Sequence, residues 1–158
     1  MLRFGLLLSA IVVILDQATK YGIIHYVMSA PKVIEVTPFF NIVMVWNRGA
    51  SFGLFSTGSA WTPVVLGGIA ILISMFLVAW LSKTDSRRLA ASLGLVIGGA
   101  LGNAVDRVLY GAVADFLDFH ALGFHWPSFN VADIAITAGV GMLLLDGLIG
   151  KRRDHKLN

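Results

Sequence analysis

Apolar positions gather into four long runs, separated by shorter and more polar stretches. The runs extend from about residue 4 to 24, 61 to 82, 89 to 107 and 129 to 150. A helix needs about 20 predominantly apolar residues to cross the hydrocarbon core of a bilayer. Each run has about this length, so the pattern predicts an all-α membrane protein built on a bundle of four transmembrane helices.

The first run also has some features of a cleaved signal peptide. However, it lacks a strongly charged N-terminal region, and it continues into Asp16, Gln17 and Lys20 instead of a small-residue cleavage site. We therefore interpret this run as a membrane span.

The segment between the first two runs, about 25–60, has the composition of β-strands, with a turn signal at Pro38. Its β-branched and aromatic residues are Val33, Ile34, Val36, Phe39, Phe40, Ile42, Val43, Val45 and Trp46. We expect a small extracytoplasmic β-sheet in this first outer loop. In the second outer loop, about 108–128, we expect four aromatic residues to lie in the membrane interface: Phe116, Phe119, Phe124 and Trp126.

The overall composition predicts a single membrane domain that spans residues 1–158. Hydrophobic residues make up 57% of the chain and charged residues only 13%, and the mean hydropathy is +0.81. A soluble domain of this size needs far more polar surface. The chain contains no cysteine, which excludes disulfides, thiolate catalysis and zinc–thiolate sites.

The positions of lysine and arginine predict the orientation in the membrane. Eight of them lie before the first span, between the second and third, or after the fourth: Arg3, Lys83, Arg87, Arg88, Lys151, Arg152, Arg153 and Lys156. The two longer loops hold only Lys32 and Arg48. Because positive residues are enriched in cytoplasmic loops, we expect both termini in the cytoplasm and both longer loops outside.

Three ionisable residues on three different spans lie at a similar depth. Asp106 is 17 residues from Leu89 and Asp133 is 17 residues from Gly150, so each lies about 25 Å from the cytoplasmic end of its helix. Lys20 reaches a similar height. Such residues are costly inside a membrane and usually mark function, so we expect a functional polar layer just below the outer surface. Residues three or four positions apart lie on one face of a helix. This spacing groups Asn103, Asp106 and Arg107 on one face of the third span, and Asn130, Asp133 and Thr137 on one face of the fourth.

Two acids have neighbouring bases. Asp16 and Lys20 are four residues apart with the acid first, which favours a helical ion pair; a direct role in substrate binding stays open. Asp146 lies near the other end of its span, and we interpret it as an interfacial carboxylate paired with Lys151 and Arg152.

A line of glycines marks the third span. Gly94, Gly98 and Gly102 recur at every fourth residue, and Asp106 continues this glycine line. Small residues at this spacing let two helices approach closely. We predict that the third and fourth spans pack tightly and turn polar groups toward each other.

Asp115 follows the third span and Asp133 begins the fourth, so both are expected at the polar layer. Two carboxylates in a partly dry site share one proton: one accepts a proton from water while the other polarises a carbonyl. The pair predicts peptide hydrolysis. Alternatively, the two residues cap a turn and a helix, because Asp is a preferred N-cap, and Asp118 and Asp106 compete for the catalytic role on the same evidence.

Other chemistries have less support. His120 and His125 could flank a metal, but the histidines lack helical ligand spacing. Ser51 and Ser128 have no neighbouring arrangement that would activate a nucleophile. The sequence has no glycine-rich phosphate loop after a strand and no basic surface for nucleic acid. We therefore expect no metal, no cofactor and no nucleic-acid partner.

An ion or proton carrier is a rival class, because buried charges also line such pathways. Here the charges cluster at one depth, and the second and fourth spans are apolar below it, so no polar path crosses the membrane. A structural membrane subunit would account for the apolar spans but not for the convergent acids.

Five motifs, in order along nearly the whole chain, resemble those of bacterial lipoprotein signal peptidases (signal peptidase II). They are Asp16-Gln-Ala-Thr-Lys20, Asn47-Arg-Gly-Ala-Ser-Phe-Gly53, Gly99-Ala-Leu-Gly-Asn-Ala-Val-Asp-Arg107, Gly111-Ala-Val-Ala-Asp-Phe-Leu-Asp118 and Phe129-Asn-Val-Ala-Asp133. Each motif alone is weak evidence for the resemblance, but the presence of all five, in the same order and on four predicted spans, is specific to this family. Many members of that family have Ala where this chain has Ser51.

The resemblance implies a membrane aspartic endopeptidase without a metal, in which Asp115 and Asp133 form the catalytic dyad. The residues implied to bind substrate or support the site are Asn47, Gly49, Asn103, Arg107, Asn130, Asp16, Lys20 and Asp106.

The resemblance also implies the substrates and the location. The substrates would be prolipoproteins whose lipobox cysteine already carries diacylglycerol, and cleavage would fall just before that cysteine. Globomycin-like cyclic peptides would block the dyad. The protein would be a multi-pass protein of the bacterial cytoplasmic (inner) membrane, surrounded by membrane lipids, with its active site near the outer face.

Overall fold

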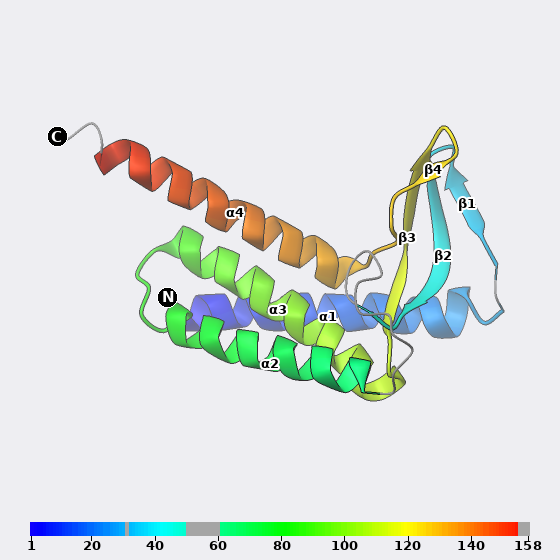
Figure 1. Ribbon diagram of the computed structural model, residues 1–158, viewed down its shortest axis with the longest axis horizontal. Helices are drawn as coiled ribbons and strands as arrows, with labels where there is room; N and C mark the ends of the chain where they lie inside the picture. The colour runs from blue at the N-terminus through cyan, green and yellow to red at the C-terminus, as the bar shows by residue number, and fades with distance from the viewer. Residues whose placement is uncertain (31, 50–60, 155–158) are drawn as a thin grey trace.

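The protein consists of four long helices with a small antiparallel sheet at one end (Figure 1). The computed structural model describes residues 1–30, 32–49 and 61–154, with side chains up to residue 148. The helices are α1 (Leu2–Gly22), which continues as a π-helix (Ile23–Val27), α2 (Thr62–Leu81), α3 (Arg87–Tyr110) and α4 (Val131–Asp154). The strands are β1 (Ile34–Thr37), β2 (Phe40–Asn47), β3 (Val113–Ala121) and β4 (Phe124–His125).

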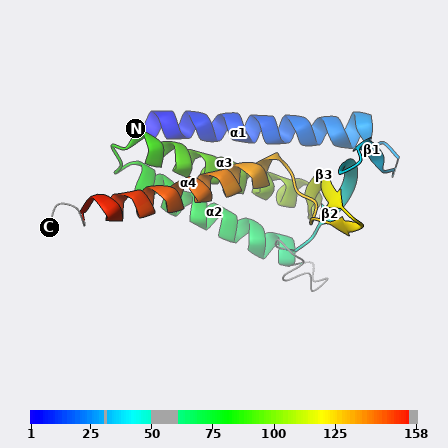
Figure 2. The same cartoon turned by 90° about the horizontal axis from the view of Figure 1, so that it is seen from above.

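All four helices are long and apolar enough to cross a membrane. α3 is the central helix and packs against α1, α2 and α4 (Figure 2). The outer helices leave large apolar side chains exposed, such as Leu72 and Phe76 on α2 and Leu144 on α4. Side chains of this kind suit contact with lipid. The predicted class, a four-helix membrane bundle with a small sheet, is confirmed.

The glycine line of α3 contacts a different helix from the one we expected. A Cβ atom at Gly98 would lie 2.7 Å from the carbonyl oxygen of Ser9 in α1. The close contact with α4 instead uses Gly99, where a Cβ atom would overlap the carbonyl oxygen of Ala132. Successive helical residues point about 100° apart, so adjacent glycines let α3 approach two different helices.

The sheet has the order β1-β2-β3-β4, with antiparallel pairing throughout. Its strands run across the ends of the helices (Figure 1). β1 and β2 come from the first connection, as expected, but β3 and β4 come from the second, where the sequence analysis assigned no strand. Phe116 is therefore buried, at 4% exposure, instead of lying in the interface, because it belongs to the fully buried first half of β3.

Candidate active site

The end of α3 determines where Asp115 lies. Gly111 adopts a left-handed conformation with φ of 66°, and its N–H donates to the carbonyl oxygen of Arg107. Glycine at this position is a common helix terminator, because the conformation is strained for other residues. The chain then turns directly into β3, whose third residue is Asp115, at 2% exposure. Asp115 thus belongs to a strand, and the alternative that it caps a turn is wrong.

Asn130 and Asp133 form a reciprocal cap at the start of α4. The backbone N–H of Asp133 donates to Oδ1 of Asn130 at 3.0 Å, and the N–H of Asn130 donates to Oδ2 of Asp133 at 3.2 Å. This is the geometry of a capping box, so the N-cap residue is Asn130 and not Asp133. Asp133 lies in the first helical turn, where the helix dipole favours a negative charge.

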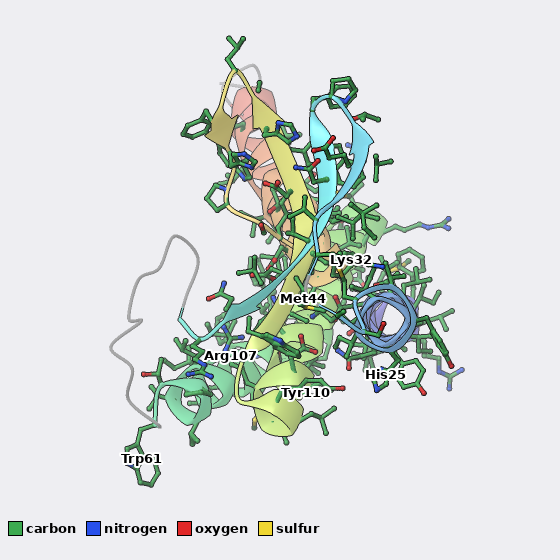
Figure 3. The ribbon with its side chains drawn as sticks, turned by 90° about the vertical axis from the view of Figure 1, so that its right-hand side faces the viewer. His25, Lys32, Met44, Trp61, Arg107 and Tyr110 are labelled. Carbon is green, nitrogen blue, oxygen red and sulfur yellow. The ribbon has the colours of Figure 1, made fainter. Side chains whose placement is uncertain are left out.

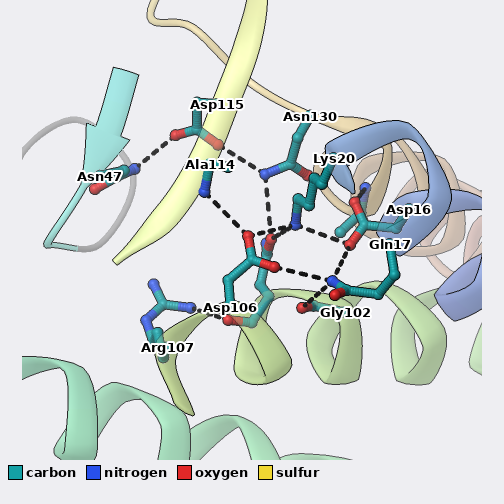
Figure 4. Close-up of polar contacts among 12 residues, drawn as sticks. Asp16, Gln17, Lys20, Asn47, Gly102, Asp106, Arg107, Ala114, Asp115 and Asn130 are labelled. Carbon is teal, nitrogen blue, oxygen red and sulfur yellow. Dashed lines mark hydrogen bonds and ion pairs between the residues drawn. The ribbon is translucent and has the colours of Figure 1, made fainter. Parts of the chain in front are cut away.

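Asparagine side chains connect the two acids, which we call the acid pair. Nδ2 of Asn130 donates to Oδ1 of Asp115 at 2.7 Å and to Oδ1 of Asn103 at 3.2 Å. Nδ2 of Asn103 donates to Oδ1 of Asp133 at 2.8 Å. The other oxygen of Asp115 accepts from Nδ2 of Asn47 at 3.0 Å (Figure 4). The two carboxylates therefore belong to one hydrogen-bonded network.

The surroundings of Asp115 favour its protonated form. Burial is the largest effect and the negative charge of Asp133 is the second, and together they raise the pKa of Asp115 from 3.8 to about 6. The hydrogen bonds from Asn47 and Asn130 act in the opposite direction but are outweighed. The structure thus provides two nearby carboxyl groups in unequal environments.

Both acids line a cavity of about 1110 Å³. One wall is the segment that connects β4 to α4, residues 126–129, which includes Trp126 and Phe129. The cavity continues along α4 past Asp133 to Thr137 and Ala138. It therefore extends from the sheet into the depth of a membrane span.

Arg107 brings a positive charge to the same cavity. Its Nη1 donates to the carbonyl oxygen of Asn103 at 3.2 Å, and its Nη2 donates to that of Gly49 at 3.1 Å. The N–H of Gly49 in turn donates to Oδ1 of Asn47 at 3.1 Å. These contacts place Asn47 and Gly49 at the end of β2 beside the acid pair (Figure 3 shows Arg107 below the sheet). Residues 50–53 of the same motif lie outside the described residues.

Lys20 lies at the centre of a buried ionic cluster behind the cavity. Its Nζ lies 2.8 Å from Oδ2 of Asp16, 2.9 Å from Oδ2 of Asp106 and 3.0 Å from Oδ1 of Asn103. Asp106, although it precedes Arg107 in the sequence, thus forms its ion pair with Lys20. Three acceptors around one ammonium group compensate for the cost of burying it.

Each carboxylate of this cluster also accepts a hydrogen bond from the main-chain N–H of the residue that directly precedes one member of the acid pair. Oδ1 of Asp16 accepts from the N–H of Ala132 at 2.9 Å, and Asp133 is the next residue. Oδ2 of Asp106 accepts from the N–H of Ala114 at 3.0 Å, and Asp115 is the next residue. We call Asp16 and Asp106 the anchoring acids.

Gln17 completes the cluster, although the sequence analysis did not single it out. Its Nε2 lies 3.1 Å from Oδ2 of Asp16, 2.9 Å from Oδ1 of Asp106 and 3.2 Å from the carbonyl oxygen of Gly102 (Figure 4). An amide between two ionisable residues in an apolar span was the signal that could have identified it.

Asp118 lies outside the site. Both of its oxygens are 2.9 Å from Nδ1 of His125, and Oδ2 accepts from Nδ2 of Asn41 at 3.1 Å. Burial alone would raise its pKa, but these hydrogen bonds outweigh burial and lower the pKa. Side chains alternate along a strand, so Asp118 points away from Asp115, three residues earlier.

The remaining predicted groups are less informative. His120 and His125 stack with ring centroids 4.8 Å apart. Among the described residues, no three His, Cys, Asp or Glu side chains are placed to hold a metal ion. Asp146 is half-buried in α4, and the side chains of Lys151 and Arg152 lie beyond those described.

Four membrane-length helices, a sheet across one end and a pair of acids, of which Asp115 is buried and Asp133 is partly buried, define a multi-pass membrane protein with an acid-lined site at one boundary of the bundle. A family model described as signal peptidase (SPase) II matches residues 8–149. The chain belongs to this family and is therefore a membrane-bound aspartic protease that removes signal peptides from prolipoproteins.

Similar proteins support this assignment. The chain is 46% identical to a lipoprotein signal peptidase from Methylobacterium sp. (strain 4-46), over 96% of this chain and 93% of that protein. It is 47% identical to one from Azoarcus sp. (strain BH72), over 88% of this chain and 79% of that protein. A solved structure described as a bacterial membrane enzyme superimposes with a TM-score of 0.81 at 36% identity, over 93% of this chain and 88% of that one.

Proposed function

We propose that Asp115 and Asp133 are the catalytic dyad and that they hydrolyse the peptide bond by activating a water molecule. The observation that carries this proposal is that both side chains line one cavity and belong to one asparagine-linked network. Asp133 lies in the first turn of α4, beside the positive end of the helix dipole. The raised pKa of Asp115 favours its protonated form. The two acids therefore suit opposite roles.

In the proposed reaction, Asp133 accepts a proton from water as the water oxygen attacks the scissile carbonyl carbon. The O–H of Asp115 donates to the carbonyl oxygen and stabilises the developing negative charge. When the C–N bond breaks, the leaving nitrogen takes the proton held by Asp133, and Asp115 regains its own. The guanidinium of Arg107 and the amides of Asn103 and Asn130 hold the acids and the substrate backbone.

We further propose that cleavage falls just before a lipobox cysteine that carries diacylglycerol. Such a substrate is confined to the membrane, with its cleavage point at the boundary. The cavity reaches from the acid pair past Thr137 along α4, which suits an apolar signal peptide that enters from the span. Globomycin-like cyclic peptides would occupy the same cavity. The membrane would be the bacterial cytoplasmic membrane, with the acid pair toward its outer face.

Substitution of either acid tests the proposal. Asp115→Asn and Asp133→Asn should each lower turnover of a purified diacylglyceryl prolipoprotein by about 10²–10⁴-fold, while the protein still unfolds cooperatively in detergent. Asp146→Asn, a matched change in α4 away from the cavity, should retain nearly full activity. Near-normal turnover by either acid-pair variant would show that the dyad is assigned wrongly.

A further inference from the structure

Large apolar side chains are exposed at the free end of the sheet, where the β1–β2 and β3–β4 turns meet. A hydrogen bond of 2.9 Å from the N–H of His120 to the carbonyl oxygen of Phe39 joins the two hairpins there. We call the exposed apolar residues at this end the sheet tip. They are Val36 (50% exposed), Phe39 (56%), Leu122 (107%) and Phe124 (69%).

Leu122 is an unusual residue for its position. It forms with Gly123 the two-residue turn between β3 and β4, and the two φ angles are 52° and 80°. Positive φ at both central positions favours Asn, Asp and Gly, and it is unfavourable for leucine. The fully exposed side chain also gains nothing from burial within the protein. Folding in water therefore gives no reason for a leucine at this position.

The position of the sheet tip indicates what covers it. In Figure 1 the sheet extends past the end of α4 that is nearest to it, and in Figure 3 it reaches away from α1, α2 and α3. The sheet tip therefore lies to the side of the bundle, next to the region that surrounds α4, and no other helix lies beneath it among the described residues. For a membrane span, these surroundings are lipid.

The charge distribution agrees with this position. Residues 36–47 and 119–132, which include both turns, contain no Asp, Glu, Lys or Arg. Uncharged segments that expose aromatic and aliphatic side chains are typical of protein surfaces that lie at the membrane interface.

We propose that the sheet tip is a membrane-contact site, at which Leu122 and Phe124, flanked by Phe39 and Val36, insert into the lipid leaflet nearest the acid pair. The contact extends the lipid-facing surface of α4 onto the sheet. It holds β4 at the bilayer, and with it the following residues 126–129, which form one wall of the cavity. The inference is independent of which residues catalyse the reaction.

Depth-dependent quenching tests this contact directly. The chain has no cysteine, so Leu122→Cys can carry a single environment-sensitive fluorophore on the full-length protein in lipid nanodiscs. Glu35→Cys is the matched control, because Glu35 is exposed on β1 of the same sheet. Quenchers on the lipid chains should reduce the signal at 122 at least about threefold more than at 35. Aqueous iodide should show the reverse order.

Two results would overturn the proposal. Equal iodide quenching at both positions would mean that the tip is in water, and shielding of position 122 from both quenchers would mean that protein covers it, such as a second copy of the chain.

A second variant tests the contribution of the Leu122 side chain by itself. Leu122→Asn suits the turn, so the hairpin should stay folded, but a fluorophore on Phe124→Cys should lose most of its lipid quenching. Unchanged quenching there would refute an anchoring role for Leu122.

Discussion

Lys20 is 2% exposed, and three acceptors on two helices surround its ammonium group. Removing one partner from a buried ionic cluster leaves charges uncompensated, at a cost of about 3–5 kcal/mol. Lys20→Met keeps a similar volume, so it should lower the thermal unfolding midpoint strongly in detergent. Adding Asp16→Asn and Asp106→Asn to this variant should recover part of the loss. Unfolding of the single variant at the parental temperature would contradict a stabilising role for the cluster.

The raised pKa of Asp115 makes the free energy of unfolding of the protein depend on pH. Its pKa rises from 3.8 to about 6, first through burial and then through the charge of Asp133. The folded protein binds this proton more tightly than the unfolded chain, so the contribution is fully present below pH 3.8 and is lost as pH rises through about 6. About two pK units correspond to about 3 kcal/mol.

Asp115→Asn removes this titration. The stability of the variant relative to the parent should therefore increase between pH 4 and pH 7. Thermal midpoints of both proteins measured across this range provide the check. Parallel curves would show that the pKa of Asp115 is not raised.

At the scale of the elements, the close packing of α1 against α3 depends on the glycine line. A Cβ atom at Gly98 would lie 2.7 Å from the backbone oxygen of Ser9 and 2.7 Å from Cβ of Val12, and neither atom belongs to a flexible side-chain end. Gly98→Ala should therefore push the helices apart and cost about 1–3 kcal/mol. A lower thermal midpoint, with reduced activity, is the expected result.

Gly68→Ala in α2 is the matched control, because a Cβ atom there would meet nothing within 4 Å. Alanine is also a better helix former than glycine, so this variant should unfold at or above the parental temperature. If both variants behaved alike, close packing at Gly98 would not explain the glycine.

Predictions from the sequence succeeded where the signal is local and failed where it depends on partners. Apolar runs are a local property, and they identified the helices that bear the site. Pairing of β2 with β3 joins residues more than sixty positions apart, and periodicity within one segment does not encode such a contact. For the same reason the glycine line was visible, but its partner helix was not. Gln17 was missed because its importance comes from Asp106, which is distant in sequence.

For the whole molecule, the arrangement of the helices predicts on which side of the membrane each connection lies. The α2–α3 connection lies at the end of the bundle opposite the sheet (Figure 1). With cytoplasmic termini, Asp85 in that connection should face the cytoplasm and Glu35 in the sheet should face outward. Single cysteines at these exposed positions can be tested with a membrane-impermeant maleimide. In intact spheroplasts the reagent should label position 35 and should reach 85 only after permeabilisation; the opposite pattern would reverse the orientation.

The anchoring acids accept hydrogen bonds from main-chain N–H groups, and such donors are almost unaffected by substitution of the residue that carries them. Among the genetically encoded amino acids, only proline lacks the N–H. Ala132 is the second residue of α4, and the second residue of α2 is Pro63, so a helix of this chain already begins with proline at that place. Ala132→Pro would therefore preserve the start of the helix but detach it from Asp16, separating the formation of α4 from the positioning of Asp133.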